Sequence, residues 1–222
     1  MPKKLWKAGN MLYPLPAVMV SVSDGNGKDN IITVAWAGTV CTNPPMVSIS
    51  VRPSRYSYQM IRDTGEFVIN LTTEELAYAT DYCGVRSGRD VDKFAEMQLT
   101  KEKAEYVKAP LIKESPVSIE CRVKEVKELG SHHMFLAEVL AVHAEEAYMD
   151  EKEKFHLNKA RPLVYSHGEY LGTGKKLGTF GYSVKKKEKD PQKSLKINKN
   201  HSGGYAGNYA VNYAETKGYK NE

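Results

Sequence analysis

The chain has 222 residues, of which 41% are hydrophobic and 27% are charged, and its formal net charge is +5. This composition is typical of a soluble protein with one large core or two small ones. No apolar run approaches the about 20 residues of a membrane-spanning helix. The basic start, residues 1–7, is not followed by the apolar segment of a signal peptide, so we expect neither secretion nor a membrane partner.

The positive charge is confined to the C-terminal end. Residues 1–184 contain 23 Lys or Arg and 23 Asp or Glu, so residues 185–222 supply the whole surplus. That segment begins with lysines and then becomes rich in Gly, Asn and Tyr, as low-complexity tails do. We predict one domain over residues 1–184 and a tail over residues 185–222. Because the domain is neutral, we do not expect a nucleic-acid partner.

The three cysteines, Cys41, Cys83 and Cys121, are odd in number, far apart and without metal-ligand spacing. They argue against a disulfide framework and predict a reducing, cytoplasmic location. The adjacent His132 and His133 have no second cluster to complete a metal site, so we expect none.

The first third of the chain reads as strands separated by turns. Residues 15–23 predict a buried strand, and Asp-Gly-Asn-Gly at 24–27 predicts a hairpin turn into a second strand at 31–37. The breaker Asn-Pro-Pro at 43–45 precedes a further strand at 46–51. This order favours an antiparallel sheet, and no G-x-G-x-x-G or Walker A sequence supports a nucleotide fold with a phosphate loop.

A polar loop follows, with Ser54, Arg55 and Ser57 opening a short helix that is predicted to end at Gly65. Two hydroxyls and a guanidinium beside a helix start suit an anionic group such as a phosphate. A plain helix cap would explain the same residues, so both interpretations stay open.

The middle of the chain continues with a strand at 66–71 and a capping sequence, Thr-Thr-Glu-Glu at 72–75, for a helix ending near Gly84. One face of this helix is predicted to be buried: Leu76, Ala79, Thr80 and Cys83. We interpret Cys83 as a small core residue rather than a reactive thiol. The polar, glycine-containing segment 83–94 reads from its residues alone as a solvated loop.

The alternating stretch 115–128 predicts a strand with one wet face. Its apolar side is Val117, Ile119, Cys121 and Val123, and the side expected to face water is Ser118, Glu120, Arg122 and Lys124. A turn at 130–133 leads into a long apolar strand at 134–143.

Several of these segments carry a resemblance. N-x-x-T-x-A-W-x-x-T from Asn30, then Pro44-Pro45 and R-x-x-R-x-S from Arg52, resembles the flavin reductase-like family, and within it the flavoredoxins. C-G-x-x-S-G-x-x-x-D-K-F from Cys83 and G-S-H-H-M-F from Gly130 resemble the same family. The likeness implies a mainly β fold, a Greek-key split β-barrel with helical insertions, that binds FMN and forms a homodimer with the flavin near the interface.

The resemblance also implies site residues. Lys93 would contact the flavin nucleotide, with Ser87 and Arg89 shaping the pocket, and His132 would contact the cofactor. Ser131 stands where the family commonly has Asp, which leaves the charge of His132 open. Tyr165 would lie near the flavin, although a core aromatic is the alternative.

FMN needs apolar walls and in-plane hydrogen bonds for its ring, and cations for its phosphate. The cofactor-binding candidates are Asn30, Trp36, Thr39, Arg55, Ser57, Asn70, Ser87, Lys93, His132 and Tyr165. His132 is the one catalytic candidate, with pure binding as its alternative.

The sequence thus predicts an FMN-dependent oxidoreductase of the flavin reductase or flavoredoxin type. Electrons would pass from NAD(P)H or a redox partner through FMN to flavin, a protein or a small acceptor. The alternative is a non-catalytic split-barrel module that binds an acidic partner or nucleic acid. The absence of a nucleophile-elbow sequence argues against a hydrolase.

Overall fold

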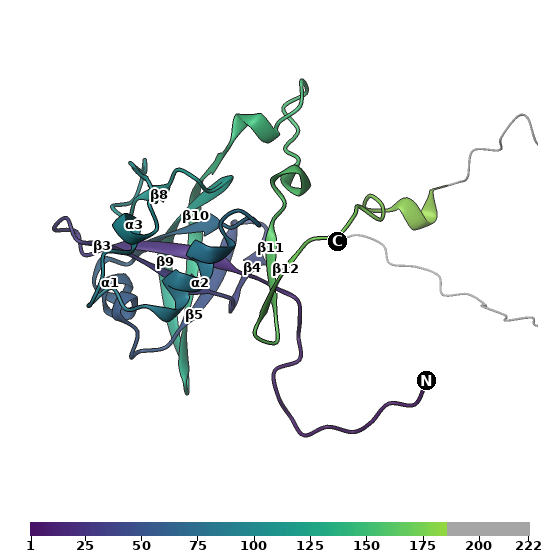
Figure 1. Cartoon of the computed structure of the whole chain (residues 1–222), viewed down its shortest axis with the longest axis horizontal. Helices are drawn as coiled ribbons and strands as arrows, with labels where there is room; N and C mark the ends of the chain where they lie inside the picture. Colours follow the sequence, from purple (N-terminus) through teal and green to yellow (C-terminus); the bar gives the residue numbers. More distant parts are fainter. Residues whose placement is uncertain (186–222) are drawn as a thin grey trace, which may run out of the picture. The chain divides into compact units, whose positions relative to one another are not determined.

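The computed structural model describes residues 1–185 (Figure 1), so the predicted tail lies almost wholly outside the described residues. The elements are β1 Leu15–Pro16, β2 Val18–Ser23, β3 Asp29–Val34, β4 Ala37–Cys41, β5 Met46–Val51, α1 Tyr56–Thr64, β6 Glu66–Leu71, α2 Ala77–Val85, α3 Lys93–Glu96, β7 Lys101–Glu102, β8 Leu111–Ile112, β9 Val117–Leu129, β10 His132–Ala144, β11 Leu163–Ser166 and β12 Glu169–Gly172. Short 3-10 helices occupy Glu146–Tyr148, Leu157–Ala160 and Tyr182–Val184.

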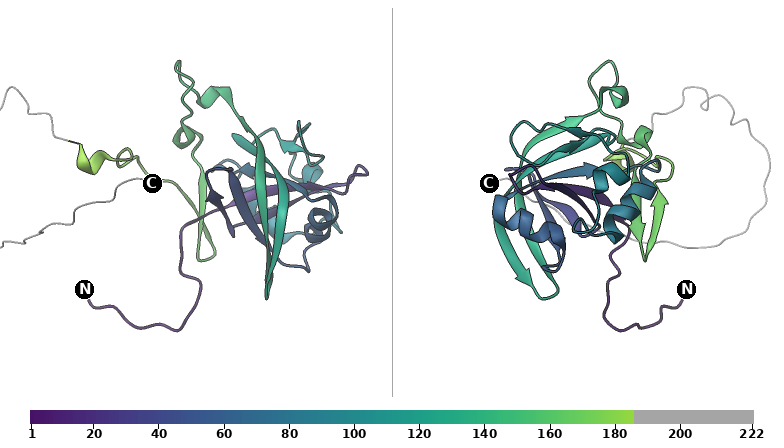
Figure 2. Two further views of the ribbon diagram at one scale, coloured as in Figure 1. Left: turned by 180° about the vertical axis from the view of Figure 1, so that it is seen from behind. Right: turned by 60° about the vertical axis from the view of Figure 1, so that its left-hand side comes forward.

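Seven of the strands form one antiparallel sheet in the order β3-β2-β6-β9-β10-β5-β4. Its two outer strands, β3 and β4, are consecutive in the chain and are joined by Ala35 and Trp36. The backbone N–H of Ser50 on β5 donates to the carbonyl of Trp36 at 2.8 Å. The sheet therefore curves into a barrel (Figures 1 and 2), which confirms the predicted split β-barrel.

The core fills the barrel because the strands alternate their side chains between two faces. On β2, Val18, Val20 and Val22 point into the main apolar cluster, which Ile61 of α1 and Phe135 of β10 complete. Met19 lies on the other face of β2, in a second cluster formed with α2 and α3. The predicted buried face of α2 is confirmed: Leu76, Ala79, Thr80 and Cys83 are all buried.

Several predicted boundaries are confirmed. The strands over 46–51 and 66–71 have the expected ends, and β2 and β3 form the expected hairpin. Helix α1 ends at Gly65, whose φ of 68° and N–H bond to the carbonyl of Ile61 are those of a left-handed cap. Helix α2 begins at Ala77, later than the capping sequence at 72–75 predicts. The Thr73 hydroxyl does accept the backbone N–H of Leu76 at 3.3 Å, as a cap would, but Glu74 and Glu75 pair with Arg161.

The single strand predicted over residues 31–37 is also wrong. The chain bends at Ala35 and Trp36, and β4 then pairs with β5 rather than continuing along β2. The apolar run is unbroken through the bend, so local pattern does not reveal the change of partner. The bend leaves the Trp36 side chain partly exposed, where it can line a surface cavity.

The prediction that one face of β9 is exposed to water is wrong for the first half of the strand. Ser118 and Glu120 are 4% and 0% exposed, because the segment before β8 crosses over them. The Glu120 carboxylate accepts backbone N–H bonds from Glu105, Tyr106 and Val107 at 2.6–3.1 Å. Farther along the strand the expected alternation holds, with Arg122 and Lys124 exposed.

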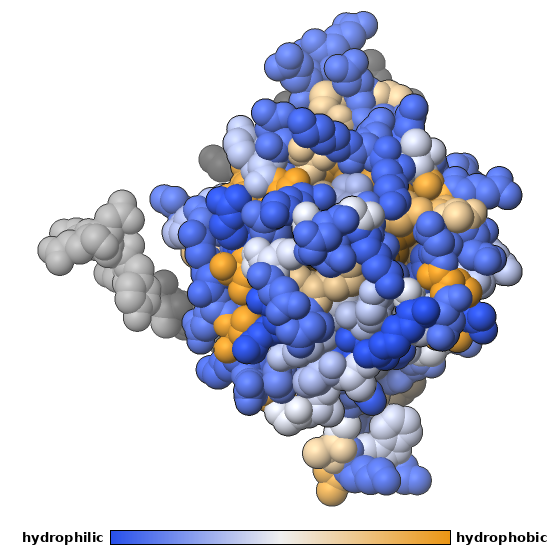
Figure 3. Space-filling view, turned by 90° about the vertical axis from the view of Figure 1, so that its left-hand side faces the viewer, coloured by the Kyte–Doolittle hydropathy of each residue, from blue (hydrophilic) through white to orange (hydrophobic). Residues whose placement is uncertain are grey.

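A small sheet, in the order β1-β11-β12, brings the end of this unit back beside its first strand. The compact unit extends to Lys176, and residues 177–185 begin a second unit. The predicted boundary after residue 184 stays a prediction. On the face shown in Figure 3, hydrophobic groups form only small separate patches on a hydrophilic surface. Within residues 1–185, no helix is long and apolar enough to cross a membrane.

Candidate functional site

Two cavities adjoin on the barrel surface. The first, of about 360 Å³, lies among β3, β5, α2, β10 and the β11–β12 hairpin. The second, of about 230 Å³, lies between the start of α1 and the loop that follows α2. Ile32, Arg52, Arg55 and Gly84 line both, so the two cavities form one continuous groove.

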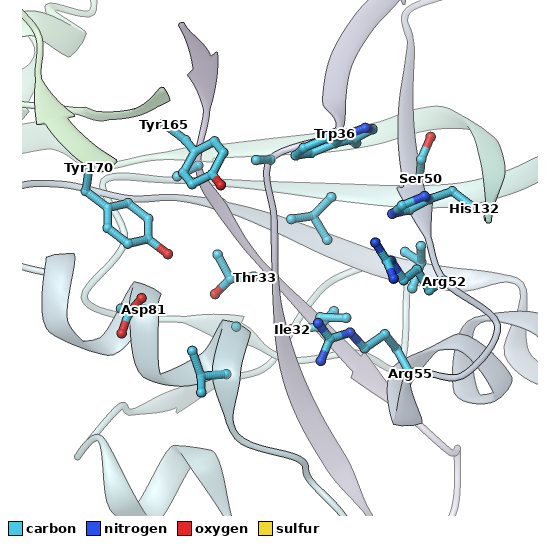
Figure 4. A pocket seen from close by; sticks show the side chains of 16 residues that line it. Ile32, Thr33, Trp36, Ser50, Arg52, Arg55, Asp81, His132, Tyr165 and Tyr170 are labelled. Atoms are coloured by element: carbon cyan, nitrogen blue, oxygen red, sulfur yellow. The ribbon is translucent and has the colours of Figure 1, made fainter. Parts of the chain in front are cut away.

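Aromatic rings wall the first cavity. The rings of Trp36 and His132 are parallel within 3°, with centroids 6.0 Å apart. Tyr165 lies 6.4 Å from Trp36 and 5.8 Å from Tyr170, at tilted angles. Figure 4 shows these four side chains around the cavity. Flat apolar walls of this kind suit a conjugated ring system.

Asp81 is the acidic residue that lines the first cavity, and it lies at the end formed by Tyr165 and Tyr170. The Tyr170 hydroxyl points toward the Asp81 carboxylate on α2 (Figure 4). Burial, and then the negative charge of Asp81, raise the pKa of Tyr170 to about 12. The phenol is therefore protonated across the physiological range and can act as a hydrogen-bond donor.

The second cavity is strongly basic: its cationic lining residues are Arg52, Arg55, Arg86, Arg89 and Lys93. Among the described residues, no carboxylate pairs with any of these four arginines, whereas Arg122 and Arg161 both have acidic partners. A guanidinium group offers planar, paired donors that match phosphate and carboxylate oxygens. The second cavity is thus suited to an anionic group supplied from outside the domain.

Lys93 occupies the floor of the basic cavity. Its side chain is buried, and Nζ donates to the carbonyls of Ile31 at 2.6 Å and Cys83 at 2.8 Å. Burial lowers the pKa of Lys93 to about 8, and the charge of Arg55 adds to the effect. Because an ammonium group has three N–H donors, one remains for a ligand. Burial also raises the pKa of the Cys83 thiol to about 11, which supports its interpretation as a core residue.

Close packing fixes the wall beside Lys93. The Asn30 side chain on β3 donates from Nδ2 to the Ser57 hydroxyl oxygen at 2.8 Å, and both residues are buried. The Gly88 backbone lies so close to Asn30 that a Cβ atom there would overlap the carboxamide group. The loop can approach β3 this closely only because it has glycine at that position.

His132 begins β10 and lies within 2.9 Å of the Ser131 hydroxyl through Nδ1. Burial lowers the pKa of His132 below 6.5, and the charges of Arg52 and Arg55 lower it further. The lowered pKa favours the neutral imidazole at pH 7. His133 lies on the opposite side of the strand, with Nδ1 2.7 Å from the Tyr58 hydroxyl.

The structure brings most of the candidates together. Those lining the groove are Asn30, Trp36, Arg55, Ser57, Ser87, Lys93, His132 and Tyr165. Thr39 lies outside both cavities, exposed on β4 opposite Val47, while Thr33 lines the first cavity. Asn70 is fully buried and contacts neither cavity; its side chain bonds Met19, Ser21, Ile112 and Ser118.

Sequence reasoning missed several lining side chains, among them Thr33, Arg52, Asp81, Arg86 and Tyr170. Arg52 lies in the same R-x-x-R pattern as Arg55, so the pattern could have predicted it as a site residue. Tyr170 pairs directly with Tyr165 across the β11–β12 hairpin, so two aromatics flanking a turn were also a signal. Arg86 lies in the C-G-x-x-S-G segment that also contains Ser87, so it had a signal too. Asp81 gave none, because only the packing of α2 against β3 brings it to the groove. In the described part of the chain, no cluster of His, Cys, Asp or Glu is arranged to hold a metal ion.

Comparisons with known proteins agree with this geometry. The family model for the flavin reductase like domain matches residues 10–174. The structure of flavoredoxin from Desulfovibrio vulgaris (Miyazaki F) is 31% identical with a TM-score of 0.78, and that of flavoredoxin from Methanosarcina acetivorans is 30% identical with a TM-score of 0.74. Both alignments cover 83% of this chain and 100% of the other. An uncharacterized protein of Archaeoglobus fulgidus is 33% identical over 141 residues, which are 64% of this chain and 78% of that protein. The chain therefore belongs to the flavin reductase-like family, and its structure resembles the flavoredoxins.

Proposed function

We propose that the protein binds FMN in the groove and acts as an FMN-dependent oxidoreductase. It would take electrons from NAD(P)H or a redox partner protein and deliver them to flavin, a protein or a small acceptor. One observation carries the proposal. A continuous groove has flat aromatic walls at one end and arginines without carboxylate partners at the other. These two ends correspond to the two chemically different ends of FMN.

The donor set fits the cofactor. Trp36 and Tyr165 can flank the ring, and the Thr33 hydroxyl can offer it a polar contact. Arg55 and Lys93 line the part suited to the phosphate. Hydrogen bonds to charged groups contribute about 1.5–3 kcal/mol each, so two or three, together with ring stacking, are enough for micromolar binding.

When bound, FMN supplies the two-electron chemistry, and the side chains bind and orient it. The Asn30 side chain donates to Ser57 and so leaves the Ser57 hydroxyl hydrogen free for an oxygen of the phosphate. Trp36 and His132, stacked in parallel, exclude water from one wall. We propose His132 as a binding residue that is neutral at pH 7 and whose imidazolium form, in acid, adjusts the electrostatic field at the ring.

The family resemblance supports a homodimer with the flavin near the interface. Thr39 and Val40 are exposed on β4, at the end of the sheet, where a second subunit could cover them. Thr39 stays a candidate cofactor contact on this proposal. We also propose a cytoplasmic location, which suits the free thiols of Cys41, Cys83 and Cys121.

The direct test is to identify the chromophore. The purified protein, loaded with flavin where necessary, is denatured, and the released compound is identified by mass spectrometry. We expect FMN in equal amount to the chain. Failure to retain FMN at micromolar concentration would overturn the proposal and favour the binding module.

A further inference from the structure

The basic cavity holds more positive charge than FMN requires. Five cationic side chains line it: Arg52, Arg55, Arg86, Arg89 and Lys93. A phosphate monoester such as that of FMN carries about two negative charges at neutral pH. Three cations would satisfy it, because Lys93 has only one free N–H and each guanidinium can pair with two oxygens. Two arginines are left over.

The position of each arginine identifies the two that are left. Arg52 and Arg55 line both cavities. They therefore lie between the first cavity, where the flavin ring would bind, and the second cavity, where its phosphate would bind. Arg86 and Arg89 line only the second cavity, on the loop after α2. The Arg89 guanidinium lies 5.4 Å from the centre of the Tyr56 ring, so an aromatic face supports its position.

The groove also has a direction. Asp81 is the acidic residue that lines it, and it lies at the tyrosine end of the first cavity, away from the arginines (Figure 4). The field along the groove therefore disfavours an anionic group near Tyr170 and favours one near Arg86 and Arg89. A second anionic substrate group would bind beside the FMN phosphate.

We propose that Arg86 and Arg89 form a second phosphate subsite, which binds the 2′-phosphate of NADPH, so that NADPH binds more tightly than NADH. This inference rests on the proposed function, because it assigns the nucleotide donor of the same site. A terminal phosphate monoester has three free oxygens and can accept paired donors from two guanidinium groups. NADH lacks that group, and the pyrophosphate that both donors share gives no discrimination between them.

Calorimetry with two nucleotide fragments tests the subsite without turnover. We expect FMN-loaded protein to bind 2′,5′-ADP at least about tenfold more tightly than 5′-AMP. The double variant Arg86→Gln/Arg89→Gln should bind both equally while keeping its FMN affinity. Arg62→Gln is the matched control, since Arg62 is an exposed arginine on α1 that lines neither cavity, and it should behave as the parent.

Three results would overturn the inference: equal binding of the two fragments by the parent, an unchanged preference in the double variant, or a loss of FMN affinity in that variant. The last would mean that Arg86 and Arg89 serve the flavin phosphate. Titrating 2′,5′-ADP and 5′-AMP into protein without flavin distinguishes failure of the second phosphate subsite from failure of FMN binding. A preference for 2′,5′-ADP that depends on Arg86 and Arg89 would then support the subsite even if FMN did not bind.

Discussion

The molecule contains two kinds of polar region, which differ in where their partners lie. Glu120 is buried, and its carboxylate is fully bonded within the chain, to three backbone N–H groups and to His143 Nε2 at 2.6 Å. The four arginines of the groove have no acidic partner among the described residues. The difference separates polar residues that maintain the fold from those available to a ligand. Asn70, a cofactor candidate by sequence, belongs by its contacts to the first kind.

The largest expected effect is on the internal region. Glu120→Ala should lower the free energy of unfolding by about 2–4 kcal/mol, because it leaves His143 and the backbone N–H groups of residues 105–107 without their partner. Urea unfolding measures the change, and the FMN affinity of the folded protein should not alter. Glu125→Ala, at an exposed position on the same strand, should change stability by less than about 0.5 kcal/mol. A similar loss in both variants would contradict the distinction.

The same carboxylate predicts the pH dependence of stability. Burial raises the pKa of Glu120, but hydrogen bonds from Glu105, Tyr106 and His143 outweigh it, so the folded pKa lies below the ordinary 4.5. Its contribution is therefore complete above 4.5 and is lost as the pH falls through the lower, folded value. Acid should destabilise the parent more steeply than Glu120→Gln.

The second prediction concerns Lys93, which belongs to both regions. Its pKa of about 8 means that it loses its charge above that pH, and a bound phosphate would hold the proton on. FMN affinity should therefore fall about tenfold between about pH 7 and 9, while the free protein becomes more stable as the buried charge is removed. Fluorescence titration across this range measures the affinity. Lys93→Met should bind weakly at every pH with little slope, and a slope equal to that of the parent would exclude Lys93.

The third prediction concerns the shape of the groove rather than its charge. Gly88→Ala should displace the Asn30 side chain and break its bond to Ser57, lowering FMN affinity by about threefold to tenfold and the melting temperature by about 2–6 °C. Gly174→Ala, where an added Cβ meets nothing within 4 Å, is the control. An unchanged affinity in Gly88→Ala would show that the Asn30–Ser57 contact does not position the cofactor.

The smallest expected effect is at His132. Since its pKa is lowered from 6.5, the imidazolium forms only in acid, where it would favour the reduced flavin. His132→Gln should lower the reduction potential of bound FMN by about 15 mV, or about 0.7 kcal/mol, at about pH 5.5 and leave it unchanged above about pH 7. The neighbouring His133 is unsuitable as a control because its ring contacts the Tyr58 hydroxyl. The control is His156→Gln, whose ring pairs with Asp150. Equal potentials for His132→Gln and the parent at both pH values would remove His132 from the site.

The sequence was a good guide wherever the determinants are local. The ends of β5 and β6, the β2–β3 hairpin and the Gly65 cap follow from β-branched runs, turn residues and a left-handed glycine. Most cofactor candidates also lie in the groove, because the motifs that they belong to fold as short units around it.

It failed where distant segments meet. The burial of Glu120 depends on the segment at 105–107, which alternation along β9 cannot reveal. The bend at Trp36 depends on which strand pairs with which. Asn70 has the same polarity as a ligand-binding residue, and only its neighbours show that its hydrogen bonds are already made.

The most direct test of the central claim compares FMN with riboflavin, which lacks only the phosphate. If Arg52, Arg55 and Lys93 hold that phosphate, the parent should bind FMN at least about a hundredfold more tightly than riboflavin, the value expected for two charged hydrogen bonds. Arg55→Gln should lose at least about tenfold of this ratio by weakening FMN alone, and Arg62→Gln should keep it. Equal affinity of the parent for FMN and riboflavin would contradict the account.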